Sequence, residues 1–217
     1  MLFWTCHHPT RMQKQHLPTG FVSISSAFRN DALPLESLAL LPGGEGSQGF
    51  LKQIAEQPLK GPGIGLFLSD PFLNIKQVSN QLKKLNISWL ANLPSIAQHD
   101  EEFRGELADV NISVARELEV LNEFRQQGFH TLAAISSVDQ ASSIADYPSD
   151  AILVLQTTTD LQISFPSLPQ RLKKAKEIAA LDTIANYDIL PIVMEPDLTL
   201  IDHPAMLRPV WFNDRFG

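Results

Sequence analysis

The chain has 217 residues, of which 44% are hydrophobic and 19% are charged, so we expect one sizeable core and a single domain over residues 1–217. Its 17 Lys and Arg against 24 Asp and Glu give a net charge of -7, which argues against nucleic acid as a partner. One cysteine, no basic leader segment and no apolar stretch of about 20 residues predict a cytoplasmic protein without a membrane role.

Strand and helix patterns alternate along most of the chain. Short apolar runs that end in polar residues are typical of buried strands, and they cover 21–26, 63–69, 87–92, 131–136, 151–156 and 189–194. Amphipathic or helix-forming patterns cover 72–86, 112–127, 138–147 and 170–185. The polar stretch HDEEFRGE, residues 99–106, is expected to form a loop. This β-α order predicts a parallel sheet covered by helices.

Two short aromatic segments at the termini, Leu2–Cys6 and Pro209–Asn213, are candidates for two further strands. With them we expect an α/β fold of the TIM type, a (β/α)8 barrel with abbreviated first and last units. About fourteen residues separate the first candidate strand from Gly20, close to the minimum for a parallel crossover. An abbreviated first unit would leave one edge of the sheet open. We therefore also expect a homo-oligomer in which a second copy covers this edge.

Polar residues at the ends of the predicted strands define a candidate site, because α/β proteins bind ligands at the carboxyl ends of parallel strands. Asp70 and Glu195 are the candidate catalytic residues, since paired carboxylates can divide into an acid and a base or, with Asp197, hold Mg²⁺. Asp70 is equally a candidate helix N-cap ahead of Pro71. The candidate binding residues for a small anionic molecule are Ser26, Arg29, Asn92, Arg104, Ser136 and Gln156.

Several short motifs occur in an order and spacing that resemble one family. They are Ser37-Leu38-Ala39-Leu40-Leu41-Pro42, Asp70-Pro71-Phe72, Ala91-Asn92-Leu93-Pro94-Ser95, Phe103-Arg104 and Glu117-Leu118-Glu119, followed by Thr131 and Asp150. From about Phe21 to Thr159 the chain resembles the phosphoenolpyruvate hydrolase-like proteins, also called TIM-barrel signal transduction proteins. The resemblance implies a TIM-type barrel and a hydrolase or lyase that acts on a small oxo-acid or phosphorylated acid.

The chain departs from this family pattern at three places. The segment Leu107-Ala108-Asp109-Val110-Asn111 lacks the first carboxylate of a family loop. Two strand ends, near Leu155-Gln156-Thr157 and near Ile189–Met194, lack the histidines that the family has there. The alternative is therefore a degenerate barrel that serves as a ligand-binding or assembly subunit. An open polar pocket at the strand ends favours the enzyme, and a mouth filled by bulky side chains favours the alternative.

Overall fold

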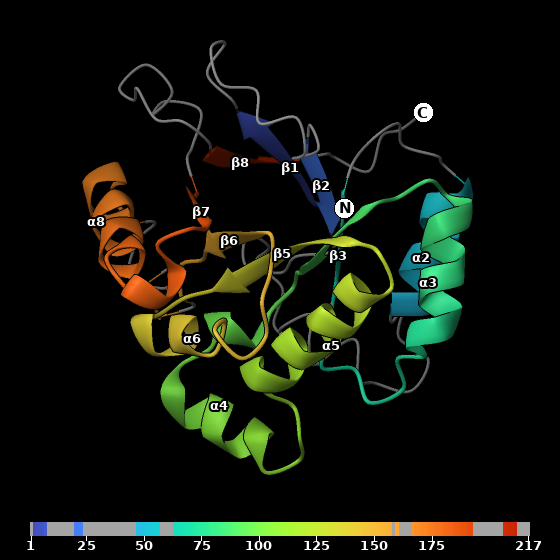
Figure 1. Cartoon of the computed structure of the whole chain (residues 1–217), viewed down its shortest axis with the longest axis horizontal. Helices are drawn as coiled ribbons and strands as arrows, with labels where there is room; N and C mark the ends of the chain where they lie inside the picture. The colour runs from blue at the N-terminus through green and yellow to red at the C-terminus, as the bar shows by residue number, and fades with distance from the viewer. Residues whose placement is uncertain are drawn as a thin grey trace.

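A computed structural model describes residues 2–7, 20–23, 47–56, 63–157, 159–160, 166–192 and 206–211. Within them an eight-stranded sheet runs in the order β7-β6-β5-β4-β3-β2-β1-β8 (Figure 1). The strands are β1 (Leu2–His7), β2 (Gly20–Ser23), β3 (Gly63–Leu66), β4 (Trp89–Asn92), β5 (His130–Ile135), β6 (Ala151–Val154), β7 (Asp188–Pro191) and β8 (Met206–Trp211). The strands from β2 to β7 are all parallel and form a curled sheet with helices outside it.

The helices alternate with these parallel strands, which confirms the predicted α/β class. They are α2 (Ser47–Glu56), α3 (Ile75–Lys84), α4 (Glu101–Ala108), α5 (Val114–Gln126), α6 (Val138–Ser142) and α8 (Leu168–Ala179), with the 3₁₀ turns η1 (Ile96–Gln98) and η2 (Asp182–Ile184). Among the described residues, no helix has the length and apolar character needed to cross a membrane.

The two terminal strands differ from the predicted barrel units. β1 runs antiparallel to β2 and also antiparallel to β8. The first unit is therefore not the parallel crossover that the sequence predicted. The edge strands β7 and β8 lie close to each other but are not hydrogen-bonded neighbours in the described sheet. The described fold is thus a curled, partial TIM-type barrel, and self-association stays a prediction.

Residues of the parallel strands alternate between two apolar layers. One layer fills the concave side of the sheet and contains Phe21, Trp89, Ala91, Leu93, Leu132, Ala134, Ala151, Leu153, Leu155, Leu190 and Ile192. The intervening residues, such as Leu90, Ala133 and Ile152, belong to the layer that packs against α3, α5 and α8. Because both faces of the sheet are buried, the strands have nearly continuous apolar sequences.

Two helix starts and one loop differ from the sequence predictions. Asn74 caps α3 by accepting the backbone N–H of Gln77 at 3.0 Å, so Asp70 is not the N-cap. Ser113 caps α5 by accepting the backbone N–H of Arg116 at 3.1 Å, so this helix begins two residues later than the predicted range 112–127. The predicted loop contains α4, whose N-cap Asp100 accepts the N–H of Phe103 at 2.9 Å. No residue of α4 is buried, and its apolar stripe is limited to Phe103 and Leu107, so the helical pattern is weak in the sequence.

Gly65, in β3, provides a test of how tightly the curled sheet is packed. A Cβ atom on Gly65 would lie 2.5 Å from the Cβ of Ser23 and 2.8 Å from the carbonyl oxygen of Leu93. We expect Gly65→Ala to lower the free energy of unfolding by about 1–3 kcal/mol, because backbone and Cβ atoms must move to relieve the overlap. Urea denaturation monitored by circular dichroism measures this change.

Gly105→Ala is the matched control, because it adds the same methyl group inside α4. Apart from its chain neighbours and the backbone of its own helix, no heavy atom of the described residues lies within 4 Å of a Cβ built there. It should stabilise the protein by about 0.5–1 kcal/mol through the higher helix propensity of alanine. A Gly65→Ala variant as stable as the wild type would contradict the packing described for β3.

Candidate functional site

The 3₁₀ turn η1 links the carboxyl ends of three parallel strands. Ser95, just after β4, accepts the backbone N–H of Ala97 at 3.1 Å through its Oγ. Ser136, just after β5, donates its hydroxyl to the carbonyl oxygen of Ala97. Gln98 donates from Nε2 to the carbonyl oxygen of Gln156, just after β6, at 3.3 Å. These contacts hold the ends of β4, β5 and β6 against one short turn.

Glu117 of α5 anchors this turn from the helix side of the sheet. Its side chain is fully buried, with 0% exposure. The carboxylate accepts the backbone N–H of Ile96 at 3.0 Å, the hydroxyl of Ser95 at 2.6 Å and the amide Nδ2 of Asn92 at 2.9 Å. A buried carboxylate needs such donors to offset its loss of hydration.

The side-chain amide of Asn92 is occupied by contacts within the protein. Besides Glu117, its Nδ2 donates to the carbonyl oxygen of Ala134 at 3.0 Å, and its Oδ1 accepts the Ala134 N–H at 2.7 Å. Asn92 therefore extends the pairing of β4 with β5 and fixes both strands to α5.

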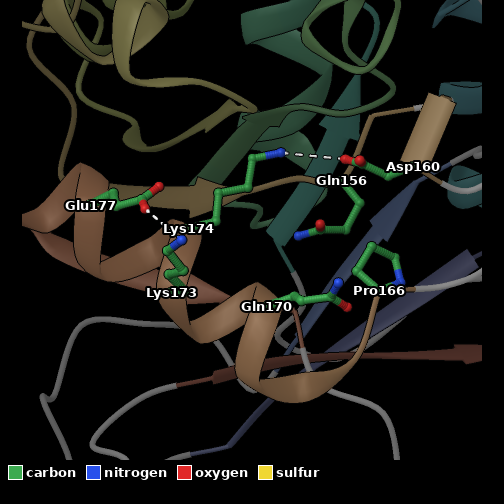
Figure 2. A pocket seen from close by; sticks show the side chains of 7 residues that line it. All are labelled: Gln156, Asp160, Pro166, Gln170, Lys173, Lys174 and Glu177. Carbon is green, nitrogen blue, oxygen red and sulfur yellow. Dashed lines mark ion pairs between the residues drawn. The ribbon is translucent and has the colours of Figure 1, made fainter.

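A cavity of about 450 Å³ lies between the end of β6 and α8 (Figure 2). Its lining residues are Gln156, Asp160, Pro166, Gln170, Lys173, Lys174 and Glu177. Gln156 is only 3% exposed, and its amide Nε2 has no hydrogen-bond partner among the described residues. Leaving a buried amide donor unpaired costs about 1–3 kcal/mol, so this group is a strong candidate for contact with a ligand.

Lys174 brings a positive charge to the same cavity. Its Nζ lies 3.6 Å from Oδ2 of Asp160, and its side chain is 24% exposed (Figure 2). Burial lowers the pKa of the Lys174 amine, and the attraction of Asp160 and Glu177 only partly opposes this. The cavity thus combines a buried amide donor with a partly desolvated amine.

Asp160 is held in place by the segment that follows β6. Its Oδ2 accepts the backbone N–H of Thr157 at 3.1 Å, and its own N–H donates to the Thr157 hydroxyl at 3.2 Å. Burial raises the pKa of Asp160, but the Thr157 hydrogen bonds and the Lys174 charge outweigh it and lower the pKa overall. This shift favours the ionised form, so Asp160 presents a negative charge beside the Lys174 amine.

The structure brings only part of the predicted site together. Of the candidate site residues, Asp70, Asn92, Arg104, Ser136 and Gln156 are described, whereas Ser26, Arg29 and Glu195 lie outside the described residues. Among the described candidates, Gln156 is the residue that lines the cavity. Arg104 lies on α4 and donates from Nη1 to the carbonyl oxygen of His99 at 3.2 Å. A pocket shared by Asp70, Asn92 and Glu195 stays a prediction.

Sequence reasoning missed the roles of Glu117, Asp160 and Lys174. For Glu117 the sequence did contain a signal. Glu117 lies next to Leu118 and one helical turn from Leu121, so its carboxylate falls on the apolar face of α5, where a charged group needs buried partners. No comparable signal distinguishes Lys174 from the other lysines of α8. Among the described residues, no group of three or more His, Cys, Asp or Glu side chains is placed to hold a metal ion.

Exchanging the Glu117 carboxylate for an amide tests its anchoring role. Glu117→Gln keeps the size of the side chain but turns one acceptor oxygen into an N–H donor facing the donors of Asn92 and Ser95. We expect the free energy of unfolding to fall by about 1–3 kcal/mol in urea denaturation. Glu119→Gln, at a side chain with 47% exposure, is the control and should stay within about 0.5 kcal/mol. Equal stability of the two variants would contradict the anchoring role.

The pKa of Asp70 predicts how stability depends on pH. Burial raises this pKa above its ordinary value of 3.8, against a smaller lowering by the 2.8 Å hydrogen bond from the Phe72 N–H. The folded protein therefore holds this proton more tightly than the unfolded chain does, and ionisation of Asp70 destabilises the fold as the pH rises. Asp70→Asn retains the acceptor for Phe72 without the charge.

We expect Asp70→Asn to unfold at a higher temperature than the wild type near pH 7, with a difference that shrinks as the pH falls to about 4. Thermal unfolding across this range measures the difference. Asp146→Asn, at an exposed position, should show a smaller and flatter difference. An Asp70→Asn variant that is less stable than the wild type at neutral pH would show that the charge of Asp70 is stabilising instead.

Comparison with known proteins agrees with the fold. A family model described as phosphoenolpyruvate hydrolase-like matches residues 50–195, which include β3 to β7 and the cavity beside α8. An uncharacterized protein of Sinorhizobium fredii (strain NBRC 101917 / NGR234), y4oT, is 24% identical over 131 residues, which cover 59% of this chain and 67% of that protein. Because the family match spans well over half of the sequence, the chain belongs to the phosphoenolpyruvate hydrolase-like family.

Proposed function

We propose that the protein binds a small anionic oxo-acid or phosphorylated acid in the cavity between β6 and α8 and acts on it as a hydrolase or lyase. The observation that carries this proposal is the buried Nε2 of Gln156, which has no hydrogen-bond partner among the described residues, beside the partly buried amine of Lys174. Membership of the phosphoenolpyruvate hydrolase-like family supports the same class of substrate.

The size and donors of the cavity suit such an acid. Small-molecule sites usually have volumes of roughly 300–1,000 Å³, and this cavity has about 450 Å³. The 3.6 Å separation between Lys174 and Asp160 is longer than a direct N–H···O hydrogen bond, so the ammonium keeps donors for a ligand. A carboxylate or phosphate can then bridge this ammonium and the Gln156 amide.

The proposal also retains the other site residues that the sequence predicted. Asp70 and Glu195 are proposed to act on the substrate or to hold Mg²⁺. The remaining binding candidates are Ser26, Arg29, Asn92, Arg104 and Ser136. For Asn92, the hydrogen bonds to Glu117 and Ala134 favour a positioning role over direct contact with the ligand.

A second candidate function is ligand binding without turnover, in a degenerate barrel. The apolar residues that follow three of the parallel strands, Leu93, Leu155 and Ile192, favour it, since they belong to the concave layer where a barrel enzyme usually places polar groups. Turnover measured on each acid that binds separates the two functions.

Isothermal calorimetry with pyruvate and phosphoenolpyruvate tests the site. Gln156→Leu should weaken binding by about tenfold or more and, without ligand, raise the free energy of unfolding, because the unpaired donor is gone. Lys174→Met should also weaken binding. Lys176→Met changes the same charge at an exposed position of α8 outside the cavity lining, and should bind like the wild type. If neither acid binds, or if Gln156→Leu and Lys174→Met bind as the wild type does, the proposal fails.

A further inference from the structure

The amines of two neighbouring lysines in α8 have different surroundings. Lys173 and Lys174 both line the cavity, but their side chains are 79% and 24% exposed. Figure 2 shows Lys173 paired with Glu177, while Lys174 extends toward Asp160 near Gln156. Lys174 therefore combines an accessible cavity, a nearby carboxylate and a neighbouring unpaired amide.

We propose that Lys174 is a catalytic residue whose amine forms an imine with the carbonyl carbon of a 2-oxo acid bound in this cavity. The inference rests on the proposed function, and it narrows the substrate to acids that carry a keto group beside the carboxylate. Gln156 Nε2 donates to an oxygen of that acid, and the Asp160 carboxylate, 3.6 Å from Nζ, orients the Lys174 amine.

The chemical state of Lys174 supports this role. An amine attacks a carbonyl only in its neutral form, and removing a lysine from water favours that form. Burial lowers the pKa of Lys174 more than Asp160 and Glu177 raise it. Desolvation of this kind is one of the ways in which proteins activate lysines for imine formation.

The reaction balances without a further reagent. The Lys174 ammonium first loses one proton to solvent in the cavity, and the free amine then forms a C–N bond with the carbonyl carbon. The carbonyl oxygen takes up protons and leaves as water while the C–O bond breaks. A protonated C=N bond remains, so one ammonium and one ketone become one iminium and one water. No electrons are transferred.

Trapping with borohydride tests the proposal on the full chain. Borohydride reduces an imine to a stable secondary amine, so incubation with pyruvate and borohydride should add one reduced pyruvyl group in intact-mass spectrometry. Peptide mapping should place it on Lys174. Phosphoenolpyruvate has no free keto group and should leave no adduct. Lys176→Arg should trap pyruvate like the wild type, whereas Lys174→Arg should leave no adduct.

Calorimetry with pyruvate, run beside the trapping, separates binding of the acid from formation of the imine. Binding without a trapped adduct overturns the imine but leaves the proposed function standing. The absence of both binding and adduct overturns both. An adduct spread evenly over the lysines of α8 also overturns the role of Lys174. If Lys174→Arg unfolds, the peptide map of the wild-type adduct decides the question on its own.

Discussion

The buried carboxylate of Glu117 is the contact on which the carboxyl edge of the sheet depends. This carboxyl group is removed from water and is held by donors from Asn92, Ser95 and Ile96. An arrangement of this kind is stable only when every donor keeps its position. The turn η1 also contacts the segments after β5 and β6. Glu117 of α5 therefore helps to fix the position of Gln156 at the cavity, although α5 itself lies over a different part of the sheet.

Side-chain alternation explains why the candidate cavity lies beside α8 instead of in the mouth of the curled sheet. Leu153 and Leu155 belong to the concave layer, so Ile152, Val154 and Gln156 point to the helices. The same rule places Asn92 toward α5, since Ala91 and Leu93 belong to the concave layer. A polar residue at the end of a strand is thus directed to one of two different environments by its position in the strand.

The sequence was sufficient for the parallel strands, the α/β class and the family, because long apolar runs and motif order are properties of the chain alone. It was not sufficient for the site. Gln156 was recognised as a binding candidate, but Lys174, which lines the same cavity, is one of several lysines in α8, and only packing distinguishes it. The antiparallel pairing of β1 with β2 was also unpredictable, because the direction of a terminal strand depends on the strand beside which it packs in the folded sheet.

The lining of the cavity is concentrated on one helix. Gln170, Lys173, Lys174 and Glu177 follow the spacing of a single α-helical stripe, on the side of the sheet that the concave layer does not use. Substitutions along this stripe can change the shape and charge of the cavity while the interior of the curled sheet keeps its packing. The residues that line this cavity can therefore diverge, or be engineered, independently of the determinants of folding.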